Sequence, residues 1–161
     1  MNTKRILELI NSGELDRDFI DIYVDAEQLE YQQDRYQNAI MKFIEQYGDA
    51  DIQIFSAPGR SEIGGNHTDH QHGKVLACAI NKDAIGVVKK TKAEEVRIVS
   101  DGADEIVVDL ADLEIREEEK GTTLALIKGV LAGFCNRGYK IGGFSAYVTS
   151  DVLIGSGVSS S

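Results

Sequence analysis

Residues 56–80 read Ser-Ala-Pro-Gly-Arg-Ser-Glu-Ile-Gly-Gly-Asn-His-Thr-Asp-His-Gln-His-Gly-Lys-Val-Leu-Ala-Cys-Ala-Ile, and no other stretch of this chain is so dense in chemistry. The stretch holds the only proline, Pro58, and all three histidines. Proline removes a backbone donor, and glycine permits backbone conformations that other residues avoid, so the sequence is a poor helix and a poor strand. We therefore expect a shaped loop that runs from a strand near residue 56 to the apolar run 75–80. Loops of this kind often present side chains to a ligand.

The residues before this stretch predict helices followed by one strand. Apolar residues recur at helical spacing in residues 3–11 and more weakly in residues 15–23. Asp25 is a suitable N-cap for a longer helix that ends at Gly48. Its apolar positions lie three and four residues apart, at Leu29, Tyr36, Ile40, Phe43, Ile44 and Tyr47. Residues 51–56 alternate well enough to form a strand that leads into the loop.

The residues after the stretch predict more strands and one helix. Residues 84–89, 95–100 and 105–110 are β-branched runs that we expect to form an antiparallel meander, and residues 144–150 alternate as a further strand. A helix capped by Thr122 or Thr123 should end at Arg137-Gly138, with the acidic run 114–119 before it as a solvated linker. This helix should face the core with Leu124, Ile127, Val130, Leu131 and Phe134. We therefore expect the α+β fold class, with a mixed and largely antiparallel sheet covered by helices.

Composition narrows the class of protein. The 161 residues suit one domain with a real core, and 17 basic against 27 acidic residues give a net charge of −10. That balance argues against nucleic acid or an anionic membrane as a partner. The longest apolar run has six residues, far below the ~20 that span a bilayer, and the charged N-terminus is no signal peptide, so we expect a cytoplasmic protein. Cys78 and Cys135 match no metal or redox spacing and should be reduced, buried, small hydrophobic residues.

The last residues form a second unusual segment, Gly155-Ser-Gly-Val-Ser-Ser-Ser161. Its glycines would let backbone N–H groups approach an anion, and its serines add hydroxyl groups, as in a phosphate-binding loop. It lacks the lysine of a Walker A loop and the third glycine of a dinucleotide fingerprint. A flexible linker is the alternative reading of such a composition.

Together the two segments resemble signatures of the GHMP kinase superfamily and, within it, the galactokinases. The first family signature is similar to Pro58-Gly59-Arg60, Gly65, His67-Thr68-Asp69 and the run 73–80, and the family's nucleotide loop is similar to residues 153–161. The resemblance covers about residues 35–161. It implies a helical N-terminal extension at residues 1–35 and a partial GHMP-kinase N-terminal domain at residues 36–161, incomplete at its C-terminus. We therefore expect a fragment of a larger kinase, inactive alone.

The resemblance implies an ATP-dependent sugar 1-kinase that uses Mg²⁺ and transfers the γ-phosphate of ATP to the anomeric hydroxyl of galactose or a related hexose. Arg60 would be catalytic, by stabilising charge on the transferring phosphoryl group. Asn66, His67, Thr68 and Asp69 would line the sugar. Ser100 would lie near the nucleotide. The phosphates would be held by Gly155, Ser156, Gly157, Val158, Ser159, Ser160 and Ser161, with Ser161 as the Mg²⁺ ligand.

The chain departs from the family pattern inside the sugar segment. Asn66 stands where galactokinases carry a glutamate that contacts the sugar, and His70 stands where they carry tyrosine. Ser61-Glu62 replaces Val-Asn, and Leu153 replaces the proline of the nucleotide loop. These departures leave the identity of the sugar open.

Three alternatives remain beside the kinase. A galactokinase-like sensor would bind sugar and ATP without catalysis. A metal-binding module would use the closely spaced histidines, which include His70 and His72. Arg60, finally, could be a surface residue paired with Glu62.

Overall fold

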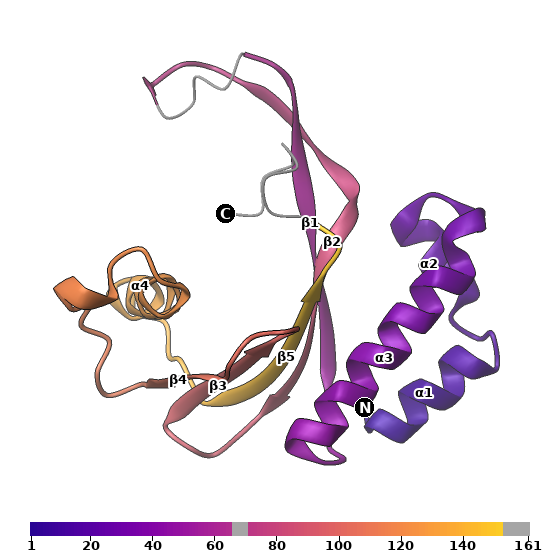
Figure 1. The fold of residues 1–161 in the computed structure, drawn as a ribbon, viewed down its shortest axis with the longest axis horizontal. Helices are drawn as coiled ribbons and strands as arrows, with labels where there is room; N and C mark the ends of the chain where they lie inside the picture. Colours follow the sequence, from indigo (N-terminus) through magenta and orange to yellow (C-terminus); the bar gives the residue numbers. More distant parts are fainter. Residues whose placement is uncertain (66–70, 153–161) are drawn as a thin grey trace.

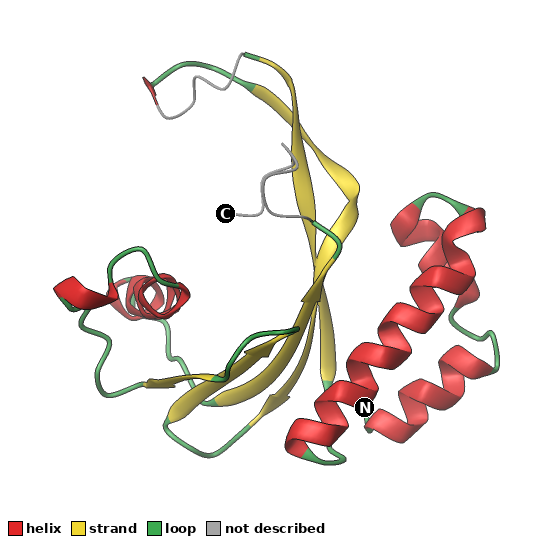
Figure 2. Cartoon of the chain, in the orientation of Figure 1, coloured by secondary structure: helices red, strands yellow, loops and turns green. Residues whose placement is uncertain are grey.

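The computed structural model describes residues 1–65 and 71–152, and these form a twisted sheet with helices on both sides (Figure 1). The helices are α1 (Thr3–Asn11), α2 (Asp16–Tyr23), α3 (Leu29–Tyr47) and α4 (Thr123–Asn136), with short 3₁₀ turns at Ala26–Gln28 and Glu117–Glu119. The strands are β1 (Gln53–Gly64), β2 (Leu76–Lys90), β3 (Glu95–Ser100), β4 (Ile106–Asp109) and β5 (Phe144–Ser150). Figure 2 shows the same elements by type.

The helix ends follow the capping residues that the sequence offers. Asp25 accepts a hydrogen bond from the Glu27 amide and caps the 3₁₀ turn at Ala26–Gln28, so α3 itself begins later than predicted, at Leu29. Gly48 ends α3 with a φ of 74°, which glycine adopts without strain. Thr122 caps α4 through the Ala125 amide, as predicted.

The two faces of the sheet carry separate apolar clusters. Helices α1–α3 lie on one side of the sheet and α4 on the other (Figure 1). On the α1–α3 side the cluster includes Phe19, Tyr36, Ile40 and Phe43 together with Ile85 and Val87 of β2. On the α4 side it centres on Val96, Val108 and Leu131. The predicted α+β class, with a largely antiparallel sheet covered by helices, is confirmed.

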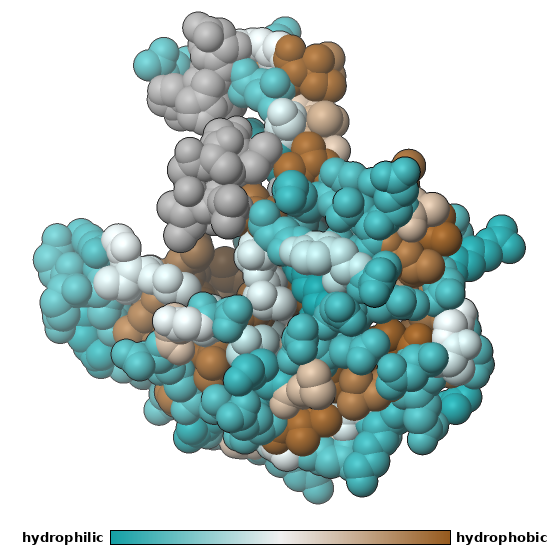
Figure 3. Space-filling view, turned by 45° about the vertical axis from the view of Figure 1, so that its right-hand side comes forward, coloured by the Kyte–Doolittle hydropathy of each residue, from teal (hydrophilic) through white to brown (hydrophobic). Residues whose placement is uncertain are grey.

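The expected loop between residue 56 and the apolar run 75–80 is wrong in its first part. Residues 56–64 continue β1, and β2 already begins at Leu76, so the two strands form a long antiparallel ribbon. Pro58 is tolerated because β1 is an edge strand of the sheet, where one side needs no backbone donor. The ribbon extends past the other strands and bends over (Figure 1). Ile63 and Leu76 in the ribbon are exposed, and Figure 3 shows apolar side chains on the protruding end of the molecule.

The predicted antiparallel meander is also wrong in its order. The sheet runs β1-β2-β5-β3-β4, so β5 separates β2 from β3 and pairs with β3 in parallel. The residues Ser145, Ala146 and Tyr147 are all buried, which suits a central strand covered on both faces. Only β3 and β4 form the expected antiparallel neighbours.

Helix α4 buries a narrower face than predicted. Leu131 is buried, but Val130 and Phe134 are half-exposed because one stripe of the helix alone faces the sheet. The acidic run before α4 is no plain solvated linker, since the carboxylate of Glu119 accepts a hydrogen bond from the buried Lys128 at 2.7 Å.

The two cysteines were expected to be buried, and that prediction is wrong. Cys78 lies in the ribbon part of β2, away from both clusters, and Cys135 lies near the C-terminal end of α4. Both side chains are exposed and neither forms a disulfide.

The N-terminal 35 residues form α1, α2 and the start of α3, and they share a core with the rest of the chain. The expected boundary at residues 35 and 36 falls inside α3. Ile10, Phe19 and Tyr23 pack in the same cluster as Ile85 of β2. No helix within residues 1–65 and 71–152 is long and apolar enough to cross a membrane.

Candidate functional site

Two of the predicted site residues lie in the part of the chain that the structure describes. Arg60 is in β1, where it pairs with Ala79 of β2 and is half-buried. Ser100 is the last residue of β3 and pairs with Val148 of β5. The predicted sugar residues Asn66, His67, Thr68 and Asp69 and the predicted phosphate and Mg²⁺ residues Gly155, Ser156, Gly157, Val158, Ser159, Ser160 and Ser161 lie outside the described residues.

Arg60 follows an irregular point in the ribbon. Pro58 pairs with Asp83 and Arg60 with Ala79, so a single residue of β1 faces three residues of β2, at positions 80–82. Such a β-bulge bends a strand and changes the direction of the side chains beside it. The backbone at this bulge therefore sets the direction in which Arg60 points.

Gly59 lies close to Val152, two residues after the end of β5. A Cβ atom at position 59 would lie 3.0 Å from Cγ2 of Val152 and 3.2 Å from Cδ1 of Ile80. Only a residue without a side chain fits there without movement of these neighbours. Val152 is the last described residue before the Gly/Ser segment, which begins three positions later at Gly155, and it lies next to the residue before Arg60.

Gly65 brings together the two described ends of the predicted sugar segment. Its φ is 119°, a conformation that L-residues avoid, and a Cβ there would lie 2.7 Å from the Lys74 carbonyl oxygen and from the Cα of Val75. The chain therefore leaves and re-enters the ribbon at nearly the same place. A side chain at position 65 would clash with this backbone, which explains why glycine is needed there.

Ser100 lies at the end of the sheet from which β5 leads to Val152. Its neighbour Asp101 donates its backbone N–H to the Val148 carbonyl at 2.9 Å, which continues the pairing of β3 and β5. The side chain of Asp101 also accepts a hydrogen bond from the Tyr147 hydroxyl, at 2.9 Å.

A buried ionic cluster joins the N-terminal helices to β1 and β2 near the bulge. The sequence analysis did not predict it. Asp83 of β2 accepts a hydrogen bond from Nη1 of Arg35 at 2.6 Å and from the Tyr23 hydroxyl at 2.9 Å, and the Ser56 hydroxyl also donates to it. Nη2 of Arg35 donates to the Asp83 backbone carbonyl at 2.7 Å, and that carbonyl also accepts from the Asp151 amide. The side chains of Arg35 and Asp83 are only 7% and 3% exposed.

The protonation states in this cluster follow from burial and charge. Burial alone would lower the pKa of Arg35, but its hydrogen bond and ion pair with Asp83 raise that pKa above the usual value, so Arg35 stays charged. Burial also raises the pKa of Tyr23 far above its usual value, with further contributions from Tyr36 and Asp83. Tyr23 is therefore a neutral hydrogen-bond donor to Asp83. The sequence offered one signal, a charged residue between apolar positions in α3, but it could not name the partner.

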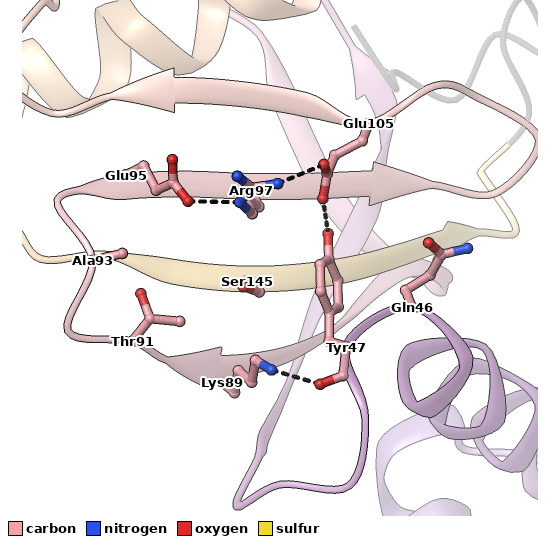
Figure 4. A pocket seen from close by; sticks show the side chains of 9 residues that line it. All are labelled: Gln46, Tyr47, Lys89, Thr91, Ala93, Glu95, Arg97, Glu105 and Ser145. Atoms are coloured by element: carbon pink, nitrogen blue, oxygen red, sulfur yellow. Dashed lines mark hydrogen bonds and ion pairs between the residues drawn. The ribbon is translucent and has the colours of Figure 1, made fainter.

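A polar pocket of about 550 Å³ lies at the opposite end of β2 (Figure 4). Arg97 contacts both Glu95 and Glu105, and the Tyr47 hydroxyl donates to Glu105 at 3.0 Å. Nζ of Lys89 donates to the Tyr47 carbonyl at 2.7 Å. The groups drawn in Figure 4 thus join the end of α3 to β2, β3 and the start of β4, and none of the predicted site residues is among them.

The metal-binding alternative gains no support from the described residues. Among residues 1–65 and 71–152, no group of three or more His, Cys, Asp or Glu side chains could hold a metal ion. His72 is exposed with a φ of 63°, and His67 and His70 lie outside the described residues.

Parts of this chain are similar to known proteins. Residues 41–90 match the family model described as the galactokinase galactose-binding signature. The galactokinase of Clostridium tetani is 34% identical over 121 residues, which are 74% of this chain and 30% of that protein. Over about three quarters of its length this chain is similar to galactokinases. The matched signature contains Arg60, Gly65 and Asp83.

Solved structures show the same relationship. The crystal structure of Lactococcus lactis galactokinase complexed with galactose matches with a TM-score of 0.67 and 28% identity, over 75% of this chain and 32% of that one. The mevalonate kinase of Methanococcus jannaschii matches with a TM-score of 0.53 and 16% identity, over 68% of this chain and 35% of that one, which shows a shared fold alone. The chain thus spans about a third of the galactokinases that it matches.

Proposed function

We propose that the protein to which this chain contributes is a galactokinase-type enzyme that transfers the γ-phosphate of ATP to the anomeric hydroxyl of galactose or a related hexose. The observation that carries the proposal is the galactose-binding signature at residues 41–90, together with the contact that places Val152 beside Gly59. That contact supports a common site, because Val152 precedes the Gly/Ser segment by three positions and packs beside the residue before Arg60. A cytoplasmic location follows from ATP as the donor.

The proposed roles divide between the two segments. Asn66, His67, Thr68 and Asp69 would bind the hydroxyl groups of the sugar. Arg60, as a permanent cation, would stabilise the charge that develops on the phosphoryl group in the transition state. Transfer of a phosphoryl group depends mainly on such positioning and charge neutralisation.

Residues 155–161 would hold the phosphates through backbone N–H groups and serine hydroxyls, and Ser100 would lie near the nucleotide. The lack of a side chain at Gly59 lets Val152, which precedes this segment in the sequence, pack closely against β1. Bound Mg²⁺, for which Ser161 is the proposed ligand, would neutralise phosphate charge.

The experiment measures ATP-dependent phosphorylation of a hexose panel, both by the whole protein and by the 161-residue chain. We expect sugar 1-phosphate from the whole protein and none from the 161-residue chain. Arg60→Ala should lower kcat more than it raises KM, because its charge acts mainly in the transition state. Binding of ATP and sugar by the whole protein without turnover would replace the kinase with a sensor, and an unchanged kcat in Arg60→Ala would remove Arg60 from the site.

A further inference from the structure

Residues of the N-terminal helices contact the bulge that sets the direction of Arg60. Asp83 closes one end of the bulge, since it is the last regular partner of β1 before positions 80–82. Within the bulge, Nδ2 of Asn81 donates to the backbone carbonyl of Tyr23 at 3.3 Å. The N-terminal 35 residues thus supply contacts both at the end of the bulge and inside it.

The Asp83 carboxylate connects three elements at this point. It accepts hydrogen bonds from Tyr23 of α2, Arg35 of α3 and Ser56 of β1. Ser56 lies four positions before Arg60 in the same strand. The carboxylate therefore fixes both strands of the ribbon on the side of the bulge that adjoins the body of the protein.

A second set of contacts holds Asp151, the residue before Val152, which packs against Gly59. The Asp151 amide donates to the Asp83 carbonyl at 3.0 Å, and the Asp151 carboxylate lies 3.4 Å from Nε of Arg35. The Tyr31 hydroxyl donates to the same carboxylate at 2.9 Å. These contacts hold the chain at the residue before Val152, which packs against the position of Gly59.

We propose that Tyr23, Arg35 and Asp83 are positioning residues for Arg60: they fix the bulge in β2 and the Asp151–Val152 segment, and these two together set the direction of the arginine. The proposal rests on the kinase function for its effect on turnover, and it gives residues 1–35 a part in the site. Asp83 acts through the backbone and does not touch substrate.

The first test is a double-mutant cycle on turnover in the whole protein. Asp83→Asn keeps the shape of the side chain and removes its charge, and it should lower kcat on the order of 10- to 100-fold, because small misplacements of a catalytic group are costly. In the Arg60→Ala background the same change should have little further effect, since the residue that it positions is gone. An equal fold-loss in both backgrounds would show a general structural role and overturn the proposal.

Milder variants guard against loss of the fold. Tyr23→Phe and Ser56→Ala each remove one hydroxyl donor to Asp83, and each should lower kcat in the wild-type background but not in the Arg60→Ala background. Glu105→Gln is the matched control, because it removes a carboxylate that also contacts a tyrosine hydroxyl and an arginine, at the pocket of Figure 4. It should leave kcat unchanged.

The second test needs no activity and separates this inference from the proposed function. In the 161-residue chain, Tyr23→Phe and Ser56→Ala should shift the backbone amide and guanidinium NMR signals of Arg60, whereas Glu105→Gln should not. If the whole protein transfers no phosphate, the kinase proposal fails while this readout still decides the positioning. Signals of Arg60 that are the same in wild type and in both hydroxyl variants would overturn it.

Discussion

Replacing Asp83 by asparagine removes the charge opposite the buried Arg35, and we expect it to lower the free energy of unfolding by about 3–5 kcal/mol. The two side chains are 7% and 3% exposed and approach to 2.6 Å, so water cannot compensate the guanidinium when its partner is lost. Asp151, at 3.4 Å from Nε of Arg35, is a more distant substitute. The loss should therefore lie in the range known for breaking a buried pair.

The matched comparison is the pair of Arg97 and Glu105, at 3.0 Å but with side chains 41% and 33% exposed. Glu105→Gln should cost only about 0.2–1 kcal/mol, because solvent screens an exposed pair. The contrast between the two pairs comes from burial, since both contain an arginine and a carboxylate within hydrogen-bond distance.

Urea unfolding followed by circular dichroism measures both variants, and a thermal scan should show Asp83→Asn melting roughly 6–20 °C lower for a chain of this length. The double variant Arg35→Met with Asp83→Asn should lose less than the sum of the single changes, because it leaves no uncompensated buried charge. A loss for Asp83→Asn as small as that for Glu105→Gln, or strict additivity in the double variant, would refute the reasoning.

Three further predictions concern other parts of the chain. Gly65→Ala should destabilise the chain by about 1–3 kcal/mol in urea unfolding, because φ is 119° and its Cβ would meet backbone atoms, whereas Gly64→Ala, with nothing within 4 Å, should be neutral. Asn66→Glu restores an acceptor-only side chain and should move the ranking of kcat/KM among hexoses toward galactose; an unchanged ranking would contradict the specificity argument. Burial and then the hydrogen bond to Asp101 raise the pKa of Tyr147 to about 12. The neutral tyrosine is therefore favoured in the folded state, and its contribution to the free energy of unfolding should be complete below pH 10 and lost between pH 10 and 12. Over that interval, the unfolding free energy of wild type should fall more steeply than that of Tyr147→Phe.

Local sequence predicted the helices well. Their apolar positions recur at helical spacing, and capping residues such as Thr122 and Gly48 mark the ends within the chain itself. The same holds for glycines of the first signature segment, whose positions follow from close contacts of the backbone. Gly65 is one example, since its conformation and its close backbone contacts both exclude a side chain.

The sheet was harder to predict because strand pairing joins residues that are distant in sequence. A proline and several glycines argued for a loop at residues 56–64, but pairing with β2 and an edge position outweighed those local preferences. The place of β5 between β2 and β3 was equally invisible, because alternation predicts that a strand exists but not which strand lies beside it.

By itself the sequence determined the helices, the α+β class and the resemblance of two segments to a family of sugar kinases, since each depends on residues that are close together in the chain. Only the tertiary structure decided which residues far apart in the sequence meet. Val152 packs against Gly59, which lies 93 positions earlier in the sequence. Arg35 binds Asp83, which lies 48 positions later, and no sequence pattern predicted that pair. A buried charge requires a partner, but which residue supplies it is fixed by how the helices pack on the sheet.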